Sequence, residues 1–205
     1  MKRLFHLLLV AVTLALSWPA LGAGIDFNPV ESGSIEDGIP VKRIAFRDGE
    51  KSIFFRPLKG WQMLGGGDQI TFTPPAPLEG EVRLGNSPLS PSILFDEPGL
   101  IIYRAAVRKF VPVQAQNVEV LSEATDAFSL DDWKSFEMRV SYTMGGKKKV
   151  RSVLFVTMNP QRQVRLVADS NEQQFEEIYT KARALIGSWF EPPPGWPGLT
   201  ISKVP

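Results

Sequence analysis

Four cations within five residues form the most concentrated chemical feature of the sequence. Lys147, Lys148 and Lys149 follow Gly145-Gly146, and Arg151 comes two residues later. Cationic side chains gathered in one place attract an acidic partner, so this run is a candidate interaction surface. The alternative is a solvated hairpin tip, whose lysines also discourage edge-to-edge pairing of strands.

A glycine-rich pattern and an acidic pattern are two further candidates for ligand binding. Gly65-Gly66-Gly67 lacks the Lys-Ser/Thr of a phosphate-binding P-loop and opens no helix, so it predicts a turn. Glu123, Asp126, Asp131 and Asp132 supply the oxygen ligands that calcium prefers, but their spacing matches no EF-hand loop. A polar strand end and a helix-capping turn are the favoured interpretation of this acidic cluster.

The side chains on which most catalytic centres depend are missing from the expected mature chain. The sequence holds no cysteine, and its one histidine, His6, lies in the N-terminal apolar segment. Without them, Ser-His-Asp and Cys-His centres cannot be built, and zinc, haem and iron–sulfur clusters lose their commonest ligands. We therefore expect no cofactor, no metal and no enzymatic activity. A hydrolase built on two neighbouring carboxylates remains as a less favoured alternative.

The N-terminal residues have the three-part layout of a secretory signal. Lys2 and Arg3 precede an apolar run over 4–18, and a proline and small residues follow it. This run is shorter than the roughly 20 residues that a membrane-spanning helix needs. We therefore expect a cleavable signal over about 1–22, cut after Gly22 or Ala23. The prediction is an exported protein, periplasmic or secreted, without stable membrane insertion after cleavage.

The chain that remains after cleavage is almost neutral. The 23 Lys and Arg of the sequence, less Lys2 and Arg3, leave 21 cations against 22 Asp and Glu. Nucleic acids and anionic membranes attract a basic surplus, so neither is indicated as a partner. About 183 residues remain, which is the size of one domain.

Hydrophobic periodicity predicts the elements that must position these residues. Alternation over 136–144, the turn Gly145-Gly146 and further strands at 149–158 and 164–168 predict an antiparallel three-strand meander. Apolar residues recur at helical spacing over about 98–111 and 170–189, which predicts two amphipathic helices. The remaining predicted strands, two hairpins and two single strands, are 41–47, 52–56, 61–64, 69–73, 81–84 and 117–124.

Both ends of the mature chain are predicted to lie outside the domain. Residues 23–40 are rich in Gly, Ser, Asp and Glu and predict a flexible lead-in. The tail 191–205 is rich in proline, which ends the preceding helix and favours an extended conformation. Trp196 in this tail is a candidate for docking into an aromatic groove of a partner. Alternatively, the tail lies back along the domain, and Trp196 covers apolar surface.

The predicted order of elements argues for an α+β fold whose antiparallel sheet is covered by helices. This order resembles the PsbP family of extrinsic photosystem II subunits and their bacterial relatives. The resemblance is carried by 54–61 (Phe-Phe-Arg-Pro-Leu-Lys-Gly-Trp), by 70–72 and by the meander with its closing helix ending at 189. It spans about 41–190 and implies one domain with an α/β/α sandwich. It implies a non-catalytic protein, and no photosystem-binding residue carries over.

Two functions follow as predictions from these observations. The first is an exported, non-catalytic domain that acts in interaction or assembly with an unidentified protein partner. The alternative is a protein that binds a small molecule or lipid in a pocket between sheet and helices. A deep apolar pocket would favour the alternative, and a filled core would count against it.

Overall fold

The computed structural model describes residues 24–36, 38–128, 132–191 and 200–201, without the side chains of 34–36, 200 and 201. The predicted signal over 1–22 and most of the predicted tail, including Trp196, lie outside the described residues. No helix among the described residues is long and apolar enough to cross a membrane.

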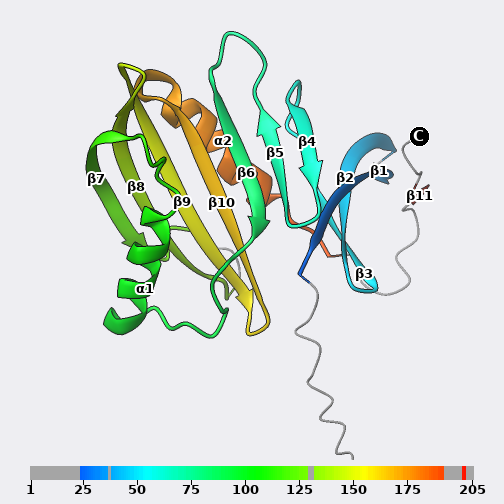
Figure 1. The fold of residues 1–205 in the computed structure, drawn as a ribbon. Coiled ribbons are helices and arrows are strands. Elements are labelled where there is room, and N and C mark those ends of the chain that lie inside the picture. Colours follow the sequence, from blue (N-terminus) through cyan, green and yellow to red (C-terminus); the bar gives the residue numbers. More distant parts are fainter. Residues whose placement is uncertain (1–23, 37, 129–131, 192–199, 202–205) are drawn as a thin grey trace, which may run out of the picture.

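Seven antiparallel strands form the larger of two sheets, in the order β4-β5-β6-β10-β9-β8-β7 (Figure 1). The meander predicted from alternation is confirmed as its last three sequential strands, and the turn between β8 and β9 has positive φ at both Gly145 and Gly146. The bounds are β4 (Gln62–Gly66), β5 (Gln69–Thr73), β6 (Gly80–Asn86), β7 (Gln116–Thr125), β8 (Lys134–Met144), β9 (Lys147–Asn159) and β10 (Arg162–Asn171).

Helix α1 (Glu97–Arg108) packs on one face of this sheet. It begins at Asp96, whose side chain accepts a hydrogen bond from the Gly99 backbone N–H at 3.0 Å. Its buried residue Tyr103 lies 5.2 Å from Phe136 and 5.4 Å from Phe155, measured between ring centres. These rings belong to an apolar cluster that includes Val167 of β10.

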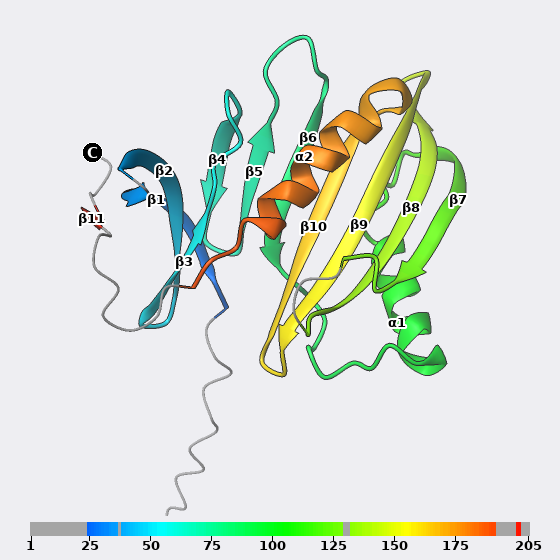
Figure 2. The same ribbon diagram turned by 180° about the vertical axis from the view of Figure 1, so that it is seen from behind.

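Helix α2 (Phe175–Gly187) crosses the opposite face (Figure 2). Its apolar stripe, which includes Ile178 and Leu185, packs in a second cluster with Leu154 and Leu166 of the sheet. The helix predicted from residue 170 begins later, because β10 continues to Asn171 and a short 3-10 helix (Glu172–Gln174) follows. The α+β class is therefore as predicted.

A second, four-stranded sheet has the order β11-β1-β2-β3. Its strands are β1 (Asp26–Glu36), β2 (Ile39–Asp48), β3 (Lys51–Phe55) and β11 (Thr200–Ile201). The predicted hairpin of 41–47 and 52–56 is present as β2 and β3. However, β1 and the start of β2 lie within the range 23–40, which was expected to be a flexible lead-in.

The start of the described chain is held by the core. Ile25 and Phe27 are 1% and 0% exposed, and the Phe27 ring lies 5.1 Å from that of Phe46. The Asn86 side-chain amide accepts from the Ile25 N–H at 3.0 Å and donates to the Ile25 carbonyl at 2.8 Å. Gly24 fits because a Cβ there would lie 2.6 Å from the Asn86 side chain. These contacts join the N-terminal strand to β6 of the other sheet.

Candidate functional site

The four residues of the predicted cationic surface are not all exposed. Lys147 and Lys148 are exposed at the start of β9, and each lies beside a carboxylate from another part of the chain. Lys147 Nζ is 3.5 Å from Glu79, and Lys148 Nζ is 2.6 Å from Glu172. The hydrogen bond to Glu172 raises the pKa of Lys148. These exposed pairs reduce the local positive charge that the run of lysines alone would give.

Arg151, the fourth residue of the predicted surface, is buried. Its exposure is 7%, and its Nε donates to Asp169 Oδ2 at 2.8 Å. It also donates to the Phe110 carbonyl, while Asp169 accepts from the Tyr142 hydroxyl and lies 3.5 Å from Lys149 Nζ. Arg151 therefore ties the segment after α1 to the sheet and does not contribute to an exposed docking surface.

A second buried carboxylate, Glu137, lies on the opposite face of the sheet. Its Oε1 accepts from Arg139 Nε at 2.6 Å and from Ser152 Oγ at 2.9 Å, and its Oε2 accepts from the Tyr179 hydroxyl at 2.6 Å. Burial, and then the bond to Glu137, raise the pKa of Tyr179 to about 12. We call this group the Glu137 network.

The two buried carboxylates do not form a catalytic pair. Glu137 packs on the α2 side and Asp169 on the α1 side, and each is neutralised by its own arginine. Within the described residues, no three Asp, Glu, His or Cys side chains gather so as to hold a metal ion. Asp131, part of the acidic cluster noted in the sequence, lies outside the described residues.

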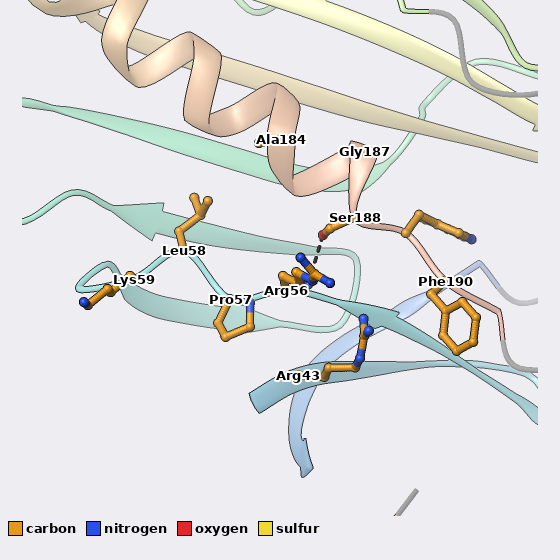
Figure 3. A pocket seen from close by; sticks show the side chains of 10 residues that line it. Arg43, Arg56, Pro57, Leu58, Lys59, Ala184, Gly187, Ser188 and Phe190 are labelled. Atoms are coloured by element: carbon orange, nitrogen blue, oxygen red, sulfur yellow. Dashed lines mark hydrogen bonds between the residues drawn. The ribbon is translucent and has the colours of Figure 1, made fainter. Parts of the chain in front are cut away.

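A cleft of about 690 Å³ opens at the C-terminal end of α2 (Figure 3). We call it the basic cleft. One wall is the segment that follows β3, and the other is the end of α2 and the residues after it. It is lined by Arg43, Arg56, Pro57, Leu58, Lys59, Ala184, Gly187, Ser188, Trp189 and Phe190.

Hydrogen bonds between distant segments hold the two walls of the basic cleft together. Phe54 and Phe190 exchange two backbone hydrogen bonds of 2.9 Å. The Ser188 hydroxyl accepts from the Arg56 backbone N–H at 2.9 Å and donates to the Leu185 carbonyl at 2.7 Å. Figure 3 shows this contact between the end of the helix and the segment after β3. Both backbone and side-chain hydrogen bonds therefore join the two walls of the cleft.

Three cationic side chains line the basic cleft. Among the described residues that line it, Arg43, Arg56 and Lys59 are the charged ones. The Arg43 guanidinium lies 5.5 Å from the centre of the Phe190 ring, in the range of a cation–π contact. The partial negative charge at the C-terminal end of α2 also favours cations here, which gives them a structural role as well.

Arg56 and Lys59 entered the sequence-based predictions only as part of the motif 54–61, and Arg43 was not predicted as a site residue. No pattern joins them, because Arg43 comes from β2 and the other two follow β3. The opposite wall is formed by the end of α2, more than 110 residues later in the chain. The only available signal was the pair Arg56 and Lys59 around Pro57-Leu58.

The protein is thus an α+β chain of two antiparallel sheets with a basic cleft beside its last helix. No protein-family model and no curated protein matches it. Solved structures to which it is similar include LpqN of Mycobacterium tuberculosis, described as involved in cell envelope biogenesis. The identity is 15%, the match covers 72% of this chain and 87% of LpqN, and the TM-score is 0.45.

Two further solved structures are similar to the chain. Cyanobacterial PsbP of Synechocystis has 12% identity, with 68% of this chain and 86% of that chain covered and a TM-score of 0.47. The Ran-binding protein Mog1p of Saccharomyces cerevisiae has 9% identity, with 80% and 95% covered and a TM-score of 0.42. The resemblance to PsbP predicted from the sequence is thus found at the level of the fold. At these identities it says nothing of function.

Proposed function

We propose that the chain is an exported, non-catalytic interaction domain of α/β/α architecture that binds an acidic segment of a protein partner in the basic cleft. One observation carries the proposal. The charged side chains among the described residues that line the cleft are Arg43, Arg56 and Lys59, whereas the whole chain has a formal net charge of only +1. A partner segment with carboxylates complements such a surface and is steered toward it over long range.

The apolar part of the lining suits the same kind of partner. Pro57, Leu58, Trp189 and Phe190 are partly exposed and border the cationic side chains. Aromatic and apolar side chains that border charged groups are the usual anchors of protein interfaces. We therefore expect the bound segment to combine carboxylates with at least one large apolar side chain.

A second candidate function uses the same cleft for a small anionic molecule. Its volume of about 690 Å³ lies within the range of ligand pockets, about 300–1,000 Å³. The cleft lies at the surface, whereas the sequence-based alternative placed a pocket between sheet and helices. Both faces of the larger sheet carry buried apolar clusters beneath the helices, which does not support an apolar pocket there.

A binding experiment with a charge-reversed variant tests the proposal. The probe is a fluorescent peptide of Asp, Glu, Leu and Phe, and the control probe replaces its acids with Lys. We expect saturable binding of the acidic peptide that weakens as salt rises. Arg56→Glu with Lys59→Glu should weaken it about tenfold or more, because each reversal removes an attraction and adds a repulsion of up to about 1 kcal/mol.

The matched control reverses the two exposed lysines outside the cleft. Lys147→Glu with Lys148→Glu changes the net charge equally and should leave the peptide affinity within about twofold. Equal loss in both double variants would show non-specific attraction and contradict the proposed site. Binding of small anions but not of the peptide, lost with Arg56→Glu and Lys59→Glu, would favour the second candidate function.

A further inference from the structure

One face of the larger sheet is only half covered. Helix α1 lies over the β7–β9 side of this face, and no helix lies over β4–β6 on the same side (Figure 1). Leu64 of β4, whose partner in β5 is Thr71, is 77% exposed there. We call the uncovered region the open half-face.

Strand register places two arginines next to each other on the open half-face. Arg83 of β6 is opposite Val167, whose side chain packs in the α1 cluster, so Arg83 points to the same side. Arg165 of β10 is opposite Gly85, two residues further along β6. Diagonal neighbours of this kind lie close enough for long side chains to meet.

The Arg165 guanidinium lies across β6 because Gly85 leaves room for it. A Cβ on Gly85 would be 3.0 Å from Arg165 Nη2. That nitrogen donates to Gln69 Oε1 of β5 at 2.8 Å, and the guanidinium carbon is 4.7 Å from the centre of the Phe110 ring. The partners of Arg165 are thus an amide and an aromatic ring, and no carboxylate of the described residues lies within 4.0 Å.

Both arginines keep a buried N–H group without a hydrogen-bond partner. Among the described residues, Nε of Arg83 and Nε of Arg165 have no acceptor in hydrogen-bond geometry, although Arg83 Nε is 3.2 Å from Glu81 Oε1. Burial, and then the neighbouring charge of Arg83, lower the pKa of Arg165. An unpaired buried donor costs free energy, and so does the approach of two like charges. Glu81 compensates part of the Arg83 charge, whereas Arg165 has no carboxylate beside it among the described residues, so an anion that reaches both guanidinium groups relieves both costs.

We propose that Arg83 and Arg165 bind an oxyanion, a carboxylate or a phosphate group, on the open half-face. The planar guanidinium donors match the oxygen spacing of both groups and bind them more strongly than neutral donors do. Thr71 of β5 is the residue opposite Arg83, so it lies on the same face. This oxyanion site shares no residue with the basic cleft.

The alternative is that the two side chains only cover the sheet with their aliphatic stems. The test follows the thermal unfolding midpoint of the chain at constant ionic strength, with chloride replaced stepwise by inorganic phosphate or by citrate. A ligand that binds only the folded state raises the midpoint in proportion to the logarithm of its excess over Kd. Phosphate and citrate also stabilise folded proteins by being excluded from their surface, so we expect the rise with at least one of them to exceed the rise in Arg165→Gln. The anion with the larger excess identifies the source of the oxyanion.

Variants locate the effect on the two arginines. Arg165→Gln and Arg83→Gln should each weaken the anion affinity tenfold or more, while Arg108→Gln, an exposed arginine in the last turn of α1, should not change it. Nitrogen-15 spectra of the unsubstituted chain give an independent readout, because the Nε–H signals of both arginines should shift with added anion. This readout stands even where a variant fails to fold.

Several results would overturn the oxyanion site. They are the absence of any rise in midpoint beyond the chloride control, an equal rise in Arg165→Gln, or Nε–H signals that do not move. The variant with Arg56→Glu and Lys59→Glu should keep the whole anion effect. Loss of the effect in that variant would assign the anion to the basic cleft instead.

Discussion

Removing the Tyr179 hydroxyl tests whether the Glu137 network stabilises the fold through a charged hydrogen bond. Tyr179→Phe keeps the ring, so it opens no cavity, but it takes from Glu137 Oε2 its one partner among the described residues. Both residues are buried, at 3% and 6% exposure, so water cannot replace the bond. A hydrogen bond to a charged group contributes about 1.5–3 kcal/mol, and we expect Tyr179→Phe to lower the free energy of unfolding by that amount.

The assay is urea denaturation followed by circular dichroism. The slope of the free energy against urea should stay unchanged, because the variant buries the same surface. Tyr103→Phe is the matched control: Tyr103 is also buried, but its hydroxyl bonds only neutral groups, the Gln163 amide at 2.9 Å and the Ile93 carbonyl at 3.3 Å. Its loss should cost about 1 kcal/mol.

The variant Glu137→Gln isolates the contribution of the negative charge of Glu137. In Glu137→Gln the partner of Tyr179 is neutral, so adding Tyr179→Phe should then cost about 1 kcal/mol or less. The reasoning is refuted if Tyr179→Phe costs no more than Tyr103→Phe, or if its cost is the same in the presence and absence of the Glu137 charge.

Two further predictions concern alkaline pH and the N-terminal strand. Because burial and Glu137 raise the pKa of Tyr179 to about 12, the folded chain holds this proton more tightly than the unfolded chain, where the pKa is about 10. The stability that this proton contributes is complete below about pH 10 and is lost as pH rises through about 12. Urea midpoints measured from pH 8 to 12 should therefore fall less steeply in Tyr179→Phe than in the unsubstituted chain. Phe27→Ala should lower the free energy of unfolding by about 3–5 kcal/mol in urea denaturation, because Phe27 is fully buried. Leu64 is 77% exposed, so Leu64→Ala should cost less than about 0.5 kcal/mol. Similar costs for the two variants would contradict an anchoring role of the N-terminal strand.

Elements formed by neighbouring residues were predictable from the sequence. The alternation over 136–144 and the two glycines after it specify a hairpin locally, and β8 and β9 pair throughout that region. The helix over 98–111 was also found, because Asp96 and Pro98 are start signals that act within one turn. Such signals depend on residues that are close in the chain.

Elements fixed by distant residues were not predictable. The composition of 26–36 is typical of a loop, and β1 forms because β2 pairs with it and the core takes up Phe27. The place of β6 beside β10 joins segments about 80 residues apart. These pairings depend on which surfaces the whole chain leaves available, which local propensity does not encode.

The candidate sites follow the same division. The run of lysines was visible in the sequence, but the carboxylates of Glu79 and Glu172 that lie beside it come from other elements. The two walls of the basic cleft are joined by Arg56 and Ser188, which are 132 residues apart. The sequence therefore predicted where the cationic side chains are in the chain. Tertiary contacts decide whether a carboxylate lies beside them and whether they are exposed.

The residues that hold Ile25 and Phe27 in place come later in the chain than the residues they hold. Ile25 and Asn86 are 61 positions apart, and the ring that packs on Phe27 belongs to Phe46. A chain that emerges amino end first, from a ribosome or through a translocation channel, therefore presents Ile25 and Phe27 to its surroundings before their partners have arrived. The first residues of the fold stay uncovered until these partners emerge, and during this interval a holding factor would have two uncovered apolar side chains to recognise.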